Sequence, residues 1–316
     1  MRRLLAAPVV LAALALAGCN TGFEPQYRVT DLRVLAIRSM VQGSTSADAY
    51  PGDTIVLDAL VANPLARPGL TVTWFGCFPV ANESLLPCAD PSFLEDPRKL
   101  ATDPRVTPLG IGESLTLPID PSVVSSALAF VKAIATAEPV FRCRLYTELV
   151  VIALAEAQGR RSAALKRVRV TPPPSELVGT DLEGAYVLNL DPDVFRVSRA
   201  PTDRSTCGGS TALDAGPFPA GRTVLCGGAA SGSRQQFNDC VPDESGTAVT
   251  LVSTPEDLTW QWYVTAGEFP EFGGIGNANG SDLEFTRPRE AFTLWTILRD
   301  GRGGEDWATF VVSALP

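Results

Sequence analysis

The most informative absence in this chain of 316 residues is histidine, which does not occur at all. Catalytic triads and dyads with an imidazole base, histidine-ligated zinc sites and most proton shuttles near neutral pH need that side chain. The sequence therefore excludes these classes of function. An enzyme would have to work with carboxylates alone, and we assign no catalytic residue.

Lysine is scarce, with only Lys99, Lys132 and Lys166, so arginine supplies most of the positive charge. Lysine and arginine total 26 against 35 aspartates and glutamates, which gives a formal net charge of −9. A negatively charged body is repelled by phosphate backbones and by anionic lipid surfaces. We therefore expect no nucleic-acid partner.

Long hydrophobic runs are lacking after the first nineteen residues, so we expect no membrane-spanning helix in the body of the protein. The N-terminus is different, because Arg2 and Arg3 precede a mostly aliphatic segment at 4–17. This segment is shorter than the roughly 20 apolar residues that span a bilayer. Positive charges followed by a short apolar run are typical of an export signal.

The apolar segment ends in Leu16-Ala17-Gly18-Cys19, which resembles the lipobox of bacterial lipoproteins. The resemblance implies that residues 1–18 are a signal peptide and that Cys19 carries a lipid. Residues 19–28 would then be the lipidated cysteine and a tether, and several acyl chains would make the attachment to the membrane permanent. By resemblance to the sorting rule of enterobacterial lipoproteins, a residue other than Asp after the lipidated cysteine, here Asn20, implies the outer membrane. The alternatives are an ordinary secretory signal with a coincidental cysteine, or a buried N-terminal helix.

Seven cysteines are present, and setting Cys19 aside leaves an even number, which in an exported protein indicates disulfides. The disulfide candidates are Cys77, Cys88, Cys143, Cys207, Cys226 and Cys240. No C-x2-C pair occurs, so a zinc cluster is not expected, and we assign no metal and no other cofactor. Each half of the chain holds three of these six cysteines. Therefore either one disulfide joins the two halves, or one thiol in each half stays free. Local pairing favours Cys226 with Cys240, and Cys77 with Cys88 or Cys143.

The first half of the chain, residues 29–171, has the pattern of strands separated by polar turns. Strands are predicted at 31–38, 54–61, 70–75 and 113–119, and a hairpin at 144–156 and 162–170 that turns at Gln158-Gly159. One helix is predicted from Asp120-Pro121, a capping residue followed by a first-turn proline, to Pro139.

Three consecutive prolines at 172–174 are predicted to link this domain to a second one at 175–316, because such runs stay extended and semi-rigid. The span 202–243 is rich in Gly, Ser and Asp, and its cysteines are expected to compensate for a thin core. Strands are predicted at 247–252, 259–265 and 283–285, and a closing hairpin at 292–299 and 306–312.

The second half carries a further resemblance. A tryptophan strand ending in Ala266-Gly267, a Gly/Asn loop, a proline turn and Leu-Trp-Thr-Ile-Leu-Arg-Asp-Gly-Arg-Gly-Gly at 294–304 look like part of a PKD-like or bacterial immunoglobulin-like domain. The first half is similar in outline, with Trp74-Phe75 matching Trp262-Tyr263. The resemblance implies an all-β protein of two immunoglobulin-like β-sandwich domains in tandem, with one short helix in the first. Together with the lipobox, the pattern resembles predicted lipoproteins of myxobacteria.

Several features suggest sites, and each has a simpler interpretation. The tryptophans could form a sugar-binding platform, but in sandwich strands Trp74 and Trp262 are predicted to be core residues, while the facing of Trp295 and Trp307 stays open. Residues 273–282 could hold calcium, but a flexible loop is favoured. Asp300 is predicted to be a turn former.

Two carboxylate pairs, Asp191/Asp193 and Glu305/Asp306, are not expected to converge as a glycosidase pair must. No G-x-S-x-G, P-loop or complete G-x-G-x-x-G occurs. We therefore expect a non-catalytic binding, adhesion or structural role in the cell envelope, with a protein or glycan partner. The ligand-binding residues stay unknown.

The alternatives are a carbohydrate- or cell-wall-binding lipoprotein and, less expected, a carboxylate-dependent hydrolase that uses the region 202–243. The expected location is the outer membrane, on its periplasmic or its outer face, through the N-terminal lipid.

Overall fold

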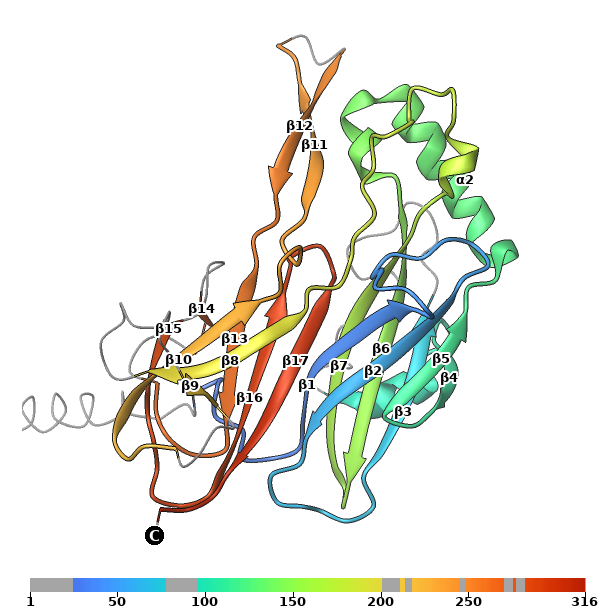
Figure 1. Cartoon of the computed structure of the whole chain (residues 1–316). Coiled ribbons are helices and arrows are strands. Elements are labelled where there is room, and N and C mark those ends of the chain that lie inside the picture. The colour runs from blue at the N-terminus through green and yellow to red at the C-terminus, as the bar shows by residue number, and fades with distance from the viewer. Residues whose placement is uncertain are drawn as a thin grey trace, which may run out of the picture.

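The computed structural model describes residues 25–77, 96–200, 211–213, 218–244, 248–269, 275–276 and 282–315, and the description below concerns these residues. They form two β-sandwich domains that lie side by side (Figure 1). The expected all-β class is confirmed. The lipobox with Cys19 lies outside the described residues. In the described part, the helices are too short or too polar to cross a membrane.

The first sandwich consists of two antiparallel sheets with the strand orders β1-β2-β5 and β4-β3-β6-β7. The bounds are β1 Arg33–Val41, β2 Thr54–Ala62, β3 Thr71–Cys77, β4 Thr107–Ile111, β5 Ser114–Pro118, β6 Thr147–Ala157 and β7 Arg160–Val170. The predicted hairpin is confirmed, since Gln158 and Gly159 take the positive φ values of 46° and 74° that a tight two-residue turn needs.

The core of this sandwich is mainly aliphatic. Trp74 of β3 is fully buried beside Ile55 and Leu57 of β2 and Val151 of β6, which confirms its predicted core position. Its indole N–H donates to the carbonyl of Gly112 at 2.7 Å, so its one polar group is satisfied.

A helical insertion separates β5 from β6. Helix α2, Pro121–Ala137, begins as predicted, because the Asp120 carboxylate accepts the N–H of Ser122 at 2.8 Å. It packs through Val124 and Leu128 on the first core. A 3-10 helix, η3 at Pro139–Arg144, follows directly. Two further 3-10 helices are η2, Pro97–Thr102, and η4, Pro174–Glu176.

The second sandwich has sheets of order β15-β10-β8-β9 and β14-β13-β16-β17, and a separate hairpin, β11-β12. The bounds are β8 Val194–Ala200, β9 Thr211–Ala212, β10 Arg222–Ala229, β11 Gln236–Pro242, β12 Val249–Pro255, β13 Thr259–Val264, β14 Ile275–Gly276, β15 Asp282–Thr286, β16 Phe292–Arg299 and β17 Glu305–Val312. Figure 1 shows the hairpin projecting from its sandwich beside the helical insertion of the first.

The two sandwiches share one strand order, to which the second adds the short strand β9 beside β8. In chain order, β1 to β7 correspond to β8, β10, β13, β14, β15, β16 and β17, which gives sheets 1-2-5 and 4-3-6-7 in the first and their equivalents in the second. Trp74 on β3 and Trp262 on β13 occupy corresponding strands, as the sequence comparison of the two halves predicted. This order is immunoglobulin-like, with a Trp-bearing central strand.

The second core is aromatic. Trp262 is fully buried with Phe285 and Phe292, and the rings of Trp260 and Trp262 stack with centroids 6.2 Å apart. These contacts confirm the predicted core position of Trp262.

The described part of the region 202–243 contains β10, whose Leu225 is fully buried, and β11. A Cβ atom at Gly227 of β10 would lie 2.8 Å from the Trp260 ring, so glycine is needed there to admit the indole. Leu213, Phe218 and Leu225 join the second core, and Cys226 and Cys240 form disulfides as expected.

One disulfide joins the two halves. Cys143 of η3 is bonded to Cys240 of β11, with Cα atoms 5.6 Å apart and 97 residues between them in sequence. The favoured pairings of Cys226 with Cys240 and of Cys77 with Cys143 were therefore wrong, because the insertions meet in space although they are far apart in the chain. Cys77 and Cys226 are also disulfide-bonded. Cys88 and Cys207 lie outside the described residues.

The sandwiches are fused through an apolar cluster rather than spaced apart. Leu35 of β1 and Leu60 of β2 pack with Trp295 and Ile297 of β16, and Tyr263 and Trp307 border this cluster. The open question of Trp295 and Trp307 is thereby answered, since both face the interface between the sandwiches. An ion pair from Arg38 to Asp306 at 2.8 Å closes its edge.

The chain passes from one sandwich to the other at positions that differ from the predicted domain boundaries. The N–H of Val29 donates to Val264 at 2.8 Å, and Tyr27 packs edge-to-face on Phe269. The last residues of the expected tether thus belong to the second sandwich. After the prolines, Leu177 and Leu182 still pack on the first sandwich with Ala135 and Leu145. The prolines therefore do not act as a spacer.

Candidate binding site

A cavity of about 430 Å³ opens where the helical insertion of the first sandwich meets the β11-β12 hairpin of the second. Its size falls within the range of small-molecule sites, roughly 300–1,000 Å³. Both sandwiches and the segment that connects them line it, with Val140, Phe141, Cys143, Arg144, Tyr146, Arg169, Tyr186, Val187, Phe237, Asn238, Asp239, Cys240 and Arg302.

The first sandwich supplies two arginines and a tyrosine. Arg144 ends η3, Tyr146 lies just before β6, and Arg169 is on β7. The Arg169 guanidinium lies 4.4 Å from the centroid of the Tyr146 ring. A cation over an aromatic ring is attracted by the electrons of the ring face, which holds Arg169 against this part of the wall.

Tyr186 forms part of the wall and is held by a buried carboxylate. Its hydroxyl donates to Oδ2 of Asp48 at 2.5 Å, and the N–H of Asn189 donates to the same oxygen at 2.8 Å. Burial and the neighbouring Asp48 raise the pKa of Tyr186 far above its usual value, so the hydroxyl stays protonated and keeps its bond. Burial also raises the pKa of Asp48 itself, against these two hydrogen bonds.

Arg302 comes from the tight turn between β16 and β17. Oδ1 of Asp300 accepts the N–H groups of Arg302, Gly303 and Gly304 at 2.7, 2.9 and 2.9 Å, which confirms the prediction that Asp300 forms the turn. The Arg302 side chain pairs with the fully buried Glu256 at 2.8 Å and lies 5.1 Å from the Phe237 ring centroid. Its charge is therefore compensated by Glu256.

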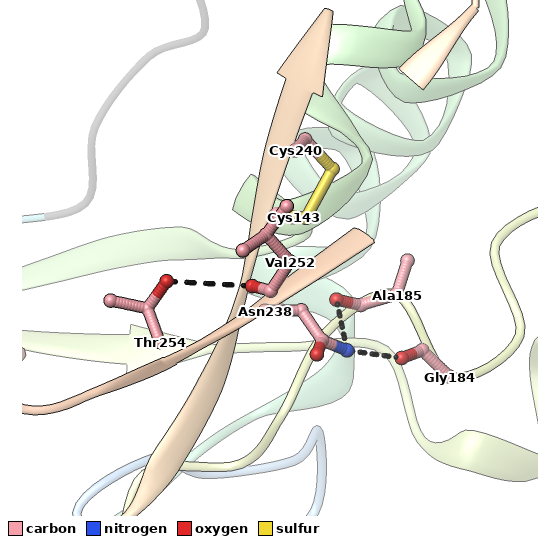
Figure 2. The surroundings of a disulfide bond; sticks show 7 residues. All are labelled: Cys143, Gly184, Ala185, Asn238, Cys240, Val252 and Thr254. Atoms are coloured by element: carbon pink, nitrogen blue, oxygen red, sulfur yellow. Dashed lines mark hydrogen bonds between the residues drawn. A yellow bond between two sulfur atoms is a disulfide. The ribbon is translucent and has the colours of Figure 1, made fainter. Parts of the chain in front are cut away.

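Strand β11 forms the opposite wall, and two kinds of contact hold it there (Figure 2). The disulfide to Cys143 fixes Cys240, and Nδ2 of Asn238 donates to the carbonyl of Gly184 at 2.9 Å. A two-stranded hairpin is marginal by itself in water, so these contacts keep the wall in place.

The charges in the lining are unequal. Arg144 is exposed and Arg169 is half-buried, and in the described part of the chain neither forms an ion pair with a carboxylate. Burial acts to lower the pKa of Arg169, but Tyr146, Tyr186 and Asp48 outweigh it and the pKa is raised. The carboxylate in the lining belongs to Asp239, which is exposed at the rim.

Two members of the predicted carboxylate pairs, Asp191 and Asp306, have structural roles outside the cavity lining, whereas the Asp193 side chain is exposed. Asp191 accepts the N–H of Glu305 at 3.0 Å, and Asp306 accepts from Arg38 at 2.8 Å and from the N–H of Val194 at 2.8 Å. Burial raises the pKa of Asp191 to about 8, although nearby Lys166 opposes this shift. These side chains hold the interface between the sandwiches together.

Of the residues singled out in the sequence, Cys143 and Cys240 reach the cavity, and Cys77 and Cys226 lie in small apolar clusters elsewhere. Of the loop 273–282, only residues 275–276 and 282 are described. Within the described ranges, no cluster of three or more Cys, Asp or Glu side chains is placed to hold a metal ion. Sequence reasoning missed Arg144, Tyr146 and Arg169. The one sequence feature that pointed to this region was the cysteine count, which suggested that a disulfide joins the two halves of the chain.

Comparisons with known proteins give no family. No protein-family description and no curated protein matches this sequence. Among solved structures, the chain is similar to dimeric latent PorU from Porphyromonas gingivalis, with 11% identity, a TM-score of 0.22, and coverage of 90% of this chain and 24% of that one. It is also similar to the β-glucuronidase of Parabacteroides merdae, with 6% identity, a TM-score of 0.18, and coverage of 88% and 25%.

The three N-terminal domains of the outer capsid protein Hoc from bacteriophage RB49 match with 9% identity and a TM-score of 0.17, over 89% of this chain and 100% of that one. The chain thus spans about a quarter of the length of the first two proteins. All three likenesses are too weak to carry an argument about function.

Proposed function

We propose that this chain is a non-catalytic binding protein of the cell envelope, held to the outer membrane by a lipid on Cys19, whose ligand enters the cavity between the sandwiches. The observation that carries the proposal is the cavity itself, whose walls come from both sandwiches and are fixed by the Cys143–Cys240 disulfide. A site that is already formed loses little conformational entropy when its ligand binds.

Carbohydrate binding is the second candidate. The aromatic rings of Phe141, Tyr146 and Phe237 line the cavity beside polar side chains, and such mixed walls suit sugar rings. The tryptophans do not support it as a platform, because Trp74, Trp260, Trp262 and Trp295 are buried.

Membrane attachment is tested by replacing Cys19 with alanine in the full chain and separating membranes from soluble fractions. Loss of the lipid should release the protein, because a short tether without acyl chains has no membrane affinity of its own. Equal membrane retention of the variant and the wild type would contradict the lipid anchor.

Ligand binding is tested on the full-length protein in mild detergent, with a panel of neutral and acidic sugars and small organic acids followed by calorimetry. Binding at the cavity should be lost in Tyr146→Ala. It should persist in Leu65→Ala, which removes an exposed side chain outside the cavity lining. Binding that both variants retain would place the site elsewhere.

A further inference from the structure

The cavity concentrates positive charge in a protein that is acidic overall. The whole chain carries a formal net charge of −9, yet Arg144, Arg169 and Arg302 all line this one cavity. Glu256 compensates Arg302, whereas no described carboxylate forms an ion pair with Arg144 or Arg169. Asp239 is the one carboxylate in the lining itself, and the buried Asp48, which accepts from Tyr186, also attracts Arg169.

The position of Arg169 suits an anion. Its guanidinium lies over the Tyr146 ring, 4.4 Å from the ring centroid, and the planar fork of donors that an arginine presents matches a carboxylate. The N–H of Tyr146 donates to the carbonyl of Arg144 at 2.9 Å, which fixes the backbone that carries both side chains. Both arginines line the same cavity as Tyr146.

Part of the remaining lining is apolar. Phe141 and Val140 are exposed side chains of η3, with exposed fractions of 36% and 41%, and Phe237 lies on the opposite strand. When a ligand covers exposed apolar side chains, apolar surface is removed from water and binding becomes more favourable. Arginines beside apolar walls favour a ligand with an anionic group on an apolar or ring-shaped body.

We propose that this cavity takes a small organic anion, whose carboxylate is bound by Arg144 and Arg169 while its ring lies against Phe141 and Phe237. The proposal rests on the proposed function, since it names the ligand class of the same cavity. A carboxylate matches the fork of N–H donors that a guanidinium presents, which makes such pairs directional as well as strong.

A carboxylate on a ring has two common sources, an acidic sugar and an aromatic acid. The probes are therefore two matched pairs, galacturonate with galactose and benzoate with benzamide, each titrated into the full-length protein in a non-ionic detergent. In at least one pair, the anion should bind at least tenfold more tightly than its neutral partner, and added salt should weaken its binding. The pair that shows this difference identifies the source.

Three variants refine the test. Arg144→Gln should weaken binding of the anion about tenfold, because it removes one charged donor that has no structural partner. Arg98→Gln is the charge-matched control and should leave binding unchanged, since Arg98 is exposed and lies outside the cavity lining. Asp239→Asn should tighten binding roughly two- to threefold, because it removes the opposing charge at the rim.

Two results would overturn the proposal. Anions and neutral partners that bind equally, and are both lost in Tyr146→Ala, would leave the cavity as a binding site but refute the ligand class. Binding of the anion that is unchanged in Arg144→Gln and in Tyr146→Ala would refute both the ligand class and the cavity as the site.

Discussion

The two sandwiches have the same strand order but differ in what fills them and in where their insertions lie. The first has an aliphatic core around a single tryptophan, Trp74, and a helical insertion between β5 and β6. The second has an aromatic core around Trp262 and a hairpin insertion between β10 and β13. The sheets are thus equivalent, and the insertions are not.

This difference separates the parts that stabilise the protein from the parts that can recognise a ligand. The sheets supply the cores and the fused interface, but the cavity is lined mainly by the insertions, the turn between β16 and β17 and the connecting segment. Each sandwich contributes only part of the lining. The binding site proposed here therefore depends on the pairing of two unequal copies.

The largest expected effect concerns the corresponding tryptophans. Trp74→Ala and Trp262→Ala should each lower the free energy of unfolding by about 3–5 kcal/mol, as truncation of a fully buried large aromatic side chain does. Because the Trp295 cluster fuses the sandwiches, we expect both variants to unfold in urea in a single transition. Tryptophan fluorescence would monitor this transition. Two separated transitions, of which only one shifts, would show that the copies fold independently.

A smaller effect is expected from the disulfide, which joins the two unequal insertions. Replacing Cys143 and Cys240 together with serine should cost about 2–4 kcal/mol, because the bridge closes a long loop in the unfolded chain. Amide exchange should rise in β11 and β12, while β13 and β16 stay protected. Unchanged exchange in the hairpin would mean that Asn238 and its neighbours suffice to hold this wall.

A third effect is a change in the pH dependence of stability at the interface between the copies. Burial raises the pKa of Asp191 to about 8, from an ordinary value of about 3.9 in the unfolded chain. The folded state therefore holds this proton more tightly, and its contribution to stability is complete below about pH 4 and lost as the pH rises to about 8. Asp191→Asn should flatten this fall and be more stable than the wild type above pH 8.

Denaturant titrations from pH 4 to 9 would measure this change. The control is Asp193→Asn, which removes the same charge from an exposed side chain on the same segment. Equal pH profiles for Asp191→Asn and the wild type would contradict the assignment of the buried carboxyl.

Local patterns in the sequence predicted much of the fold. The alternation around Trp262, the turn at Gln158-Gly159 and the cap at Asp120 each depend on neighbouring residues, and the structure confirms all three. The strand β10 was missed because its Gly227 serves a distant partner, the Trp260 ring, and composition alone cannot show such a contact.

The candidate site could not be predicted for a related reason. Arg144 and Arg169 lie in different elements, and only the folding of β7 against the segment after η3 brings both into one cavity lining. The pairing of Cys143 with Cys240 depends on two insertions whose meeting no short-range pattern encodes. Long-range geometry, rather than residue type, decides both features.

The pairing of Tyr27 and Val29 with Val264 has a consequence for how the chain can be divided. The segment that precedes the first sandwich completes the second, so the two sandwiches are joined at the start of the chain as well as at the disulfide. Cutting the gene at the prolines would deprive the second sandwich of Tyr27 and the first of Leu177. Neither sandwich is therefore a self-contained segment of the sequence.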